Sequence, residues 1–298
     1  MKRGIGRAAI LIIALLAVIP HGQGQQPAPA AEFKWRNELP ADKYPGLRHG
    51  SFPSAAMKVD VGYCIYLPPG YDDPVNKAVR YPVVYRLHGG RPGSEIGAVG
   101  ITAFLDNAMR KQQVSPMIYV FPNGGVVSHY DYPSLKSLGE TAFIKELIPH
   151  VDRKYRTIAA RNGRAVEGFS QGGRGAARAL FKYPDLFCSA IAVAGGHQHE
   201  KRIADNQGDE GKYQFEPGNN TWDLARKYAD RAERSTRLLV VVGTKDMNHQ
   251  ANLDWMEHLE SLKVPFARRI VEGVGHNSEA IQEKAGLEMM KFHAERFK

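Results

Sequence analysis

One short motif constrains the fold of this chain more than any other stretch. Gly168, Ser170 and Gly172 form the pattern G-x-S-x-G, which is typical of a sharp turn that lifts a serine above the edge of a parallel sheet. Such a turn joins a strand to a helix. The neighbouring residues agree, because residues 164–166 resemble a short strand and residues 173–181 a helix of small side chains. The motif is weak alone, but in this context it predicts a nucleophile at Ser170.

The rest of the chain alternates between apolar strands and amphipathic helices. Continuous apolar strands are typical of a sheet that is buried on both faces, and their alternation with helices predicts an α/β fold with a mostly parallel sheet. An antiparallel pair is expected over residues 47–67. The other expected strands cover residues 81–87, 116–121, 164–166, 188–193, 238–242 and 266–271, and the expected helices cover residues 103–111, 141–155, 173–181, 221–231, 251–262 and 279–297.

Two polar residues follow later strands in the order that serine chemistry requires. A serine hydroxyl needs a base to remove its proton, and the base needs an acid that orients it and compensates its charge. Asp246 follows the strand that ends at Val242, and His276 follows the strand that ends at Val271. Because open α/β sheets place their sites at the carboxyl ends of strands, we expect Asp246 to be the orienting acid and His276 the general base.

Other residues compete for these two roles. Asp246 could instead cap the next helix, and Asp254 is the rival acid, although it falls inside an expected helix. Three further histidines have different expected places. His88 is expected to shape the loop that it borders, His249 to line the site or an exposed loop, and His150 to lie on the surface of a helix.

The loop that follows His88 is expected to form part of an oxyanion hole. The tetrahedral intermediate of acyl transfer carries an oxyanion, which needs two positioned N–H donors. The backbone amide of Gln171, directly after the nucleophile, is one expected donor. The other is Gly90, with Arg91 as the second choice, because glycine allows a close backbone approach. The alternative is that Gly89 and Gly90 only form a turn.

The first residues are typical of an export signal. Three basic residues precede an apolar run over residues 8–19, which is too short to span a bilayer comfortably. We expect a signal peptide over residues 1–24, a flexible leader over residues 25–44 and a single α/β-hydrolase domain over residues 45–298. The protein is then secreted or periplasmic, without stable membrane insertion after cleavage. An uncleaved membrane anchor is the alternative.

Composition excludes several partner classes. The formal charge of +9 includes three basic residues of the expected signal peptide, and the remaining excess is spread along the chain without a basic cluster that aromatic residues interleave. We therefore expect no nucleic-acid binding. Cys64 and Cys188 fall in strands that would not be neighbours, so two buried free thiols are expected. The spacing of Cys and His indicates no metal site and no cofactor. The oligomeric state is not indicated.

Residues 197–220 interrupt the alternation. This stretch is polar, contains glycine and has no clear periodicity, and we expect an insertion near the mouth of the active site rather than a separate domain. Several aromatic residues in expected loops could face a sugar or phenolic ring, or could serve only for packing. They are Tyr130, Tyr132, Tyr213 and Trp222.

Taken together, these motifs resemble the esterase D family of α/β-hydrolases. That family includes feruloyl and acetylxylan esterases, enterochelin esterases and mycolyltransferases of the antigen 85 type. The resemblance extends over residues 45–295, and two residues depart from the family pattern: Gln171 stands where methionine is common, and Glu167 replaces a small or apolar residue. The matching segments are residues 66–71, 81–90, 146–156, 168–173, 183–187, 243–246 and 275–276.

The resemblance implies an α/β-hydrolase fold and a secreted carboxylic-ester hydrolase that works through an acyl-enzyme. Feruloyl or acetyl esters of polysaccharides are the leading substrates. A siderophore or polyester esterase and an acyltransferase are alternatives from the same chemistry. A non-catalytic carbohydrate-binding protein is the remote alternative, because one fold hosts many functions.

Overall fold

The computed structural model describes residue 1 and residues 33–39, 44–231 and 237–297. Contacts divide the chain into Met1–Glu32 and the compact unit Phe33–Lys298, and everything below concerns the second unit. Apart from Met1, the expected signal peptide lies outside the described residues, as does most of the expected leader.

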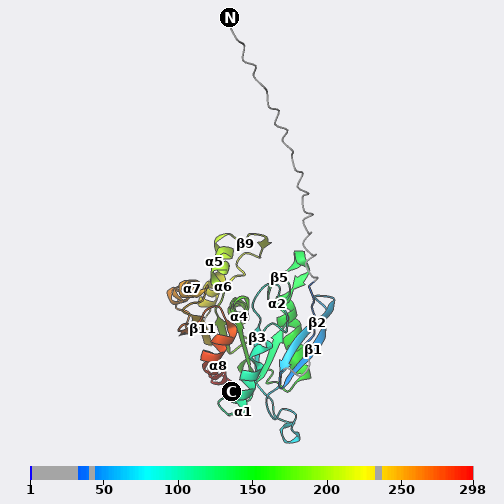
Figure 1. Cartoon of the computed structure of the whole chain (residues 1–298). Coiled ribbons are helices and arrows are strands. Elements are labelled where there is room, and N and C mark those ends of the chain that lie inside the picture. The colour runs from blue at the N-terminus through cyan, green and yellow to red at the C-terminus, as the bar shows by residue number, and fades with distance from the viewer. Residues whose placement is uncertain (2–32, 40–43, 232–236, 298) are drawn as a thin grey trace. The chain divides into compact units, whose positions relative to one another are not determined.

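A mostly parallel sheet runs through the unit (Figure 1). Its eight described strands lie in the order β1-β2-β4-β3-β7-β8-β11-β12. The pairs β1–β2 and β2–β4 are antiparallel, and the others are parallel. This arrangement confirms the predicted α/β sheet and its antiparallel start. The strands are β1 (Leu47–Ser54), β2 (Val59–Tyr66), β3 (Val83–Leu87), β4 (Ile118–Pro122), β7 (Arg164–Phe169), β8 (Ser189–Val193), β11 (Arg237–Gly243) and β12 (Ala267–Val271).

Helices follow the parallel strands as the sequence predicts. Residues 139–154 form one helix with a π-helical stretch (Ala142–Leu147) between α2 (Gly139–Thr141) and α3 (Ile148–Lys154). Pro149, which has no N–H to donate, lies two residues after the end of the π stretch. The other helices are α1 (Thr102–Arg110), α4 (Gln171–Lys182), α5 (His197–Asp205), α6 (Thr221–Ala229), α7 (His249–Ser261) and α8 (Ser278–Ala294), and 3₁₀ turns cover Pro74–Asn76, Val99–Ile101, Pro133–Leu135 and Arg161–Gly163.

The strands are buried on both faces because alternate side chains enter different cores. On β11, Val240 and Val242 pack with α4, α6 and α7, whereas Leu239 and Val241 pack with α8. On β3, Val84 points to a third cluster, which α1 and α8 complete. Apart from the partly exposed edge strands β1 and β12, the sheet therefore presents only the ends of its strands to solvent, and the loops at those ends are the places for a site.

Residues 197–220 contain more regular structure than their sequence indicates. They form α5 and a hairpin of β9 (Asp209–Glu210) and β10 (Tyr213–Gln214). A second small hairpin joins β5 (Asp131–Tyr132) to β6 (Ser137–Leu138). The buried face of α5 consists of His197, Glu200 and Ile203, so two of its three buried residues are polar and no hydrophobic period is visible.

Two further sequence expectations concern single residues. The surface position expected for His150 is wrong, because its ring is half-buried 5.4 Å from the ring of Tyr63, whose hydroxyl lies 3.1 Å from Nε2. Both cysteines are free and buried as expected. Cys64 lies on β2 and Cys188 precedes β8, and these strands are not neighbours. Every helix among the described residues is too short or too polar to cross a lipid bilayer.

Candidate active site

Ser170 occupies the turn between β7 and α4. Its backbone has φ 56° and ψ −113°, a conformation that residues other than glycine rarely adopt and that concentrates at functional sites. The backbone amide of Ser170 donates a hydrogen bond of 2.8 Å to the carbonyl oxygen of Val193 at the end of β8. The strained turn is therefore held by the neighbouring strand.

Glycines around Ser170 let α4 approach the sheet closely. A Cβ atom at position 168 would lie 2.3 Å from the carbonyl oxygen of Gly172, and one at position 172 would lie 2.3 Å from that of Leu87. A Cβ at Gly173 would lie 2.6 Å from the carbonyl oxygen of Val193. All of these obstacles are backbone atoms, which cannot rotate away. The spacing of the motif therefore follows from the packing of the helix start against β3, β7 and β8.

The structure brings Ser170, His276 and Asp246 together. The Nε2 atom of His276 lies 3.0 Å from the Oγ of Ser170, and its Nδ1 atom lies 3.0 Å from both carboxylate oxygens of Asp246. The Asp246 side chain is fully buried, and that of His276 is 21% exposed. The imidazole thus connects a buried carboxylate to a hydroxyl at the surface of the turn.

The loops after β11 and β12 hold the acid and the base against each other. The amide of Lys245 donates to the carbonyl oxygen of Val274 over 2.9 Å, and a Cβ at Gly243 would lie 2.1 Å from that same oxygen. Asp246 is not the cap of the next helix, because α7 begins after Asn248, whose amide donates to Asp246 Oδ1 over 2.7 Å.

The competing residues lie elsewhere or serve other contacts. Asp254 is exposed on α7 and accepts a hydrogen bond of 2.8 Å from Gln250. His249 begins α7, and its amide donates to the carbonyl oxygen of Asp246 over 2.9 Å. Asn248 was not singled out by its sequence, although an acidic residue two positions before an Asn is a known turn pattern.

The loop after β3 lies beside Ser170. A Cβ at Gly89 would lie 3.4 Å from the Cβ of Ser170. Gly90 has φ +76° with open space around its Cα, and its carbonyl accepts a hydrogen bond from Ser128. Gln171 is the first residue of α4, where amides have no acceptor within the helix. The oxyanion-hole roles of Gly90 and Gln171 stay predictions.

His88 supports this loop as a neutral side chain. The amide of Gly124 donates to its Nε2 atom over 3.0 Å, so Nδ1 carries the proton and faces the carbonyl oxygen of Gly89 at 3.1 Å. Burial lowers the pKa of His88 to about 4. The ring therefore joins the loop after β3 to the loop after β4.

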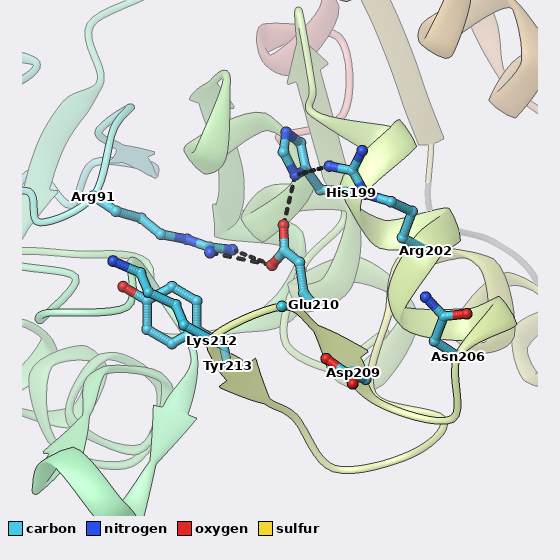
Figure 2. Close-up of a pocket in the computed structure, with 9 residues that line it drawn as sticks. Arg91, His199, Arg202, Asn206, Asp209, Glu210, Lys212 and Tyr213 are labelled. Carbon is cyan, nitrogen blue, oxygen red and sulfur yellow. Dashed lines mark hydrogen bonds and ion pairs between the residues drawn. The ribbon is translucent and has the colours of Figure 1, made fainter.

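A pocket of about 460 Å³ opens next to Arg91 (Figure 2). Both terminal nitrogens of Arg91 lie 3.1 Å from Glu210 Oε2, and the other oxygen of Glu210 lies 2.6 Å from His199 Nδ1. We call this cavity the hairpin pocket, since α5 and the β9–β10 hairpin form most of it. Its lining residues are Arg91, His199, Arg202, Asn206, Asp209, Glu210, Gly211, Lys212 and Tyr213.

The expected aromatic residues divide between packing and this pocket. Tyr130 and Tyr132 belong to a buried cluster with Phe215, and Trp222 is buried in the first turn of α6 rather than in a loop. Tyr213 lines the hairpin pocket. The pocket was not predicted, because its ion pair joins positions 119 residues apart. In the described part of the chain, no group of three His, Cys, Asp or Glu side chains is arranged to hold a metal ion.

Comparison with known proteins places this site in an esterase family. The family described as "Putative esterase" matches residues 54–286. Esterase Rv1288 of Mycobacterium tuberculosis (strain ATCC 25618 / H37Rv) is 30% identical over 261 residues, which are 80% of this chain and 55% of that protein. An endo-1,4-beta-xylanase/feruloyl esterase of Xylanibacter ruminicola is 29% identical over 150 residues, which are 47% of this chain and 20% of that protein. The chain thus spans about half the length of the first relative.

The solved structure of a ferulic acid esterase has the same fold. It superimposes with a TM-score of 0.70 at 24% sequence identity, and the match covers 85% of this chain and 98% of that chain. The α/β-hydrolase fold that the sequence predicts is confirmed.

Proposed function

The chain belongs to the esterase family, and we propose that it hydrolyses carboxylic esters through an acyl-enzyme on Ser170. The observation that carries the proposal is the continuous hydrogen-bonded series from Ser170 through His276 to Asp246. A hydroxyl, a base and an orienting carboxylate in this arrangement constitute the machinery of nucleophilic acyl transfer.

In the proposed reaction, Ser170 Oγ attacks the ester carbonyl carbon while His276 Nε2 takes the hydroxyl proton. Asp246 holds the imidazole by Nδ1 and compensates its positive charge. The amides of Gln171 and Gly90 stabilise the oxyanion. Collapse of the intermediate breaks the bond to the alcohol oxygen, which receives the proton from His276. Water, deprotonated by His276, then releases the acid and restores Ser170.

Feruloyl or acetyl esters of polysaccharides are the substrates that we propose. The relative described as an endo-1,4-beta-xylanase/feruloyl esterase and the shared fold with a ferulic acid esterase support this choice. The hairpin pocket, which Arg91 of the loop after β3 helps to line, adds hydrogen-bonding side chains and the ring of Tyr213, a combination that suits a sugar. We also propose that the protein is exported after removal of residues 1–24.

A fluorophosphonate probe tests the nucleophile directly. The folded wild-type protein should be labelled at Ser170, and Ser170→Ala should remain unlabelled and hydrolyse no p-nitrophenyl acetate. Labelling at another serine would contradict the assignment. Absence of labelling, with sugar binding retained, would favour the non-catalytic alternative.

A substrate screen tests the chemical class. The competing substrate classes are represented by methyl ferulate, acetylated xylan, enterobactin and a hydroxyalkanoate oligomer. An added sugar acceptor reveals acyl transfer. We expect turnover of the first two. Activity restricted to the siderophore or the polyester would replace our substrate class, while leaving the esterase proposal intact.

A further inference from the structure

The hairpin pocket is joined to the nucleophile by a short series of contacts. Gln171, the residue after Ser170, accepts a hydrogen bond of 2.8 Å from Arg174 Nε. The Nη2 atom of Arg174 lies 4.0 Å from Glu210 Oε2, which belongs to the pocket. On the other side, Arg91 lines the pocket and directly follows Gly90. The cavity is therefore flanked by residues that adjoin Gly90 and Gln171, the two expected oxyanion donors.

Positive side chains outnumber carboxylates around the pocket. Arg91, Arg202 and Lys212 line it together with Asp209 and Glu210 (Figure 2). Arg202 and Lys212 are both exposed, and their charged groups contact the His199 ring nitrogen at 2.6 Å and the ring of Tyr213 at 5.1 Å. Neither contact neutralises a positive charge, so both cations are available to a ligand.

Glu210 does not cancel this excess. Burial alone would raise its pKa, but the hydrogen bond from His199 and the charge of Arg91 outweigh burial and lower the pKa below its usual range. The carboxylate is therefore ionised and already bound to Arg91 and His199. It is engaged by those partners, so only Asp209 is left to offset Arg202 and Lys212, and the lining keeps an excess of positive charge.

A buried arginine behind the pocket adds to the positive potential. The side chain of Arg174 has no exposed surface, and its nearest carboxylates are Glu200 at 3.3 Å and Glu210 at 4.0 Å. Among the described residues, neither Nη1 nor Nη2 of Arg174 has a hydrogen-bond partner. Because buried charges are expensive unless fully paired, a negative group in the adjacent cavity would be favoured.

We propose that the hairpin pocket binds a carboxylate on the saccharide part of the substrate, and that the preferred ester is one whose sugar chain carries a uronic acid. This inference rests on the proposed function. In a feruloyl or acetyl ester the carboxyl group of the acid is consumed in the ester bond. A free carboxylate must therefore lie on the saccharide. Arg202 and Lys212 would hold it by charge-assisted hydrogen bonds.

Binding to the Ser170→Ala protein tests the pocket without catalysis. Isothermal titration calorimetry compares a xylo-oligosaccharide that bears one glucuronate with the same oligosaccharide lacking it. We expect the acidic ligand to bind at least about tenfold more tightly at low salt, and the difference to shrink as salt screens the charges. Equal affinity, or tighter binding of free ferulate than of either oligosaccharide, would overturn the proposal.

Two single variants locate the site within the pocket. Arg202→Ala and Lys212→Ala should each weaken binding of the acidic oligosaccharide by about three- to tenfold and leave the neutral one unaffected. Arg268→Ala is the matched control, because Arg268 is 61% exposed on β12 and the variant loses the same charge. An equal loss of affinity in the control would mean that the overall charge of the protein, rather than the hairpin pocket, attracts the acidic oligosaccharide. That outcome would overturn the proposal.

Activity separates this proposal from the one on which it rests. In the wild type, kcat/KM for the uronate-bearing ester should exceed that for the matched neutral ester, and Arg202→Ala should reduce the ratio. If both esters are hydrolysed at equal rates, the pocket proposal fails and the esterase stands. If the Ser170→Ala protein binds the acidic oligosaccharide but the wild type hydrolyses no ester, the esterase proposal fails and the pocket stands.

Discussion

Asp246 makes two contacts through its carboxylate. Its Oδ1 atom accepts the amide hydrogen of Asn248 over 2.7 Å, and both of its oxygens face Nδ1 of His276 at 3.0 Å. An asparagine at this position has one acceptor and no charge. Its side-chain nitrogen, which donates and cannot accept, would replace one of the two oxygens that face Nδ1 of His276.

We therefore expect Asp246→Asn to fold normally and to lower kcat/KM for p-nitrophenyl acetate by about 10³- to 10⁴-fold, since the base loses its orientation and the compensation of its charge. Circular dichroism checks the fold, and steady-state kinetics check the rate. Asp254→Asn is the control, because Asp254 is exposed on α7. If the Asp254 variant were the impaired one, Asp246 would not be the acid.

Gly172 gives a second residue-scale prediction. A Cβ there would lie 2.3 Å from the carbonyl oxygen of Leu87, a backbone atom of the sheet. We expect Gly172→Ala to lower the free energy of unfolding by at least about 2 kcal/mol, since α4 must move away from β3. Urea denaturation measures the effect. Gly196→Ala is the matched control, because its Cβ would meet only side-chain atoms at 3.5 and 3.9 Å, and comparable losses would refute the steric argument.

At the scale of elements, a buried ionic contact links three parts of the fold. Arg86 on β3 lies 2.7 Å from Glu167 on β7, and His293 on α8 lies 3.4 Å from the same carboxylate. Arg86 also donates to Ser278 Oγ at the start of α8 over 3.1 Å. These contacts tie the strands that lead to His88 and Ser170 to the helix that follows His276.

Glu167→Gln should make the free energy of unfolding less dependent on pH in the acidic range. Burial alone would raise the pKa of Glu167, but the charges and hydrogen bonds of Arg86 and His293 lower it from 4.5 to about 2. The stabilisation from this depressed pKa is complete above the unfolded value and is lost as pH falls through the folded value. Between about pH 5 and pH 3, the wild type should therefore lose more unfolding free energy than the variant.

Denaturant unfolding at both pH values checks this prediction, with Glu257→Gln as the control because Glu257 is exposed on α7. Identical pH dependence in wild type and Glu167→Gln would mean that Glu167 is not held ionised by its partners. The same network explains why a charged residue occupies a position where the related family has a small or apolar one.

On the scale of the whole unit, the segment before β1 is attached to the domain through a buried carboxylate and a backbone hydrogen bond to the sheet. Glu95 has no exposed surface and accepts hydrogen bonds from the backbone of Asn37 over 2.6 Å and from the side chains of Asn37 and Asn123 over 3.0 Å. The amide of Gly62 on β2 donates to the carbonyl oxygen of Trp35 over 2.7 Å. Part of the expected leader therefore contacts the sheet.

Two truncations test this attachment. A chain that begins at residue 45 should lose roughly 1–3 kcal/mol of unfolding free energy, because the buried carboxylate of Glu95 loses its Asn37 donors. A chain that begins at Phe33 keeps these contacts and should match the full-length protein. Thermal and urea unfolding measure both. Equal stability of the two truncated chains would show that residues 33–44 contribute nothing.

The sheet and the Ser-His-Asp arrangement were accessible from sequence because both are encoded locally. Apolar strands such as residues 238–242 have no helical period, and Ser170, Asp246 and His276 each follow a strand within a few positions. Open parallel sheets gather such loops at one edge. A short local pattern therefore implies a long-range geometry.

The remaining features depend on partners that no local pattern reveals. Arg91 and Glu210 are distant in sequence, and nothing near either residue predicts their contact. The helix α5 buries His197 and Glu200 against polar partners, so a hydrophobic period does not mark it. The hairpin pocket and its charges therefore emerge only from the folded chain.

The position of His276 has a consequence for the timing of activity during synthesis. This residue follows β12, which is the edge strand of the sheet and pairs with β11, the neighbour of β8. A nascent chain that contains Ser170 but not yet His276 thus lacks the proposed base, and its hydroxyl is unactivated. The order of residues alone therefore delays the activation of Ser170 until the last strand of the sheet has been synthesised.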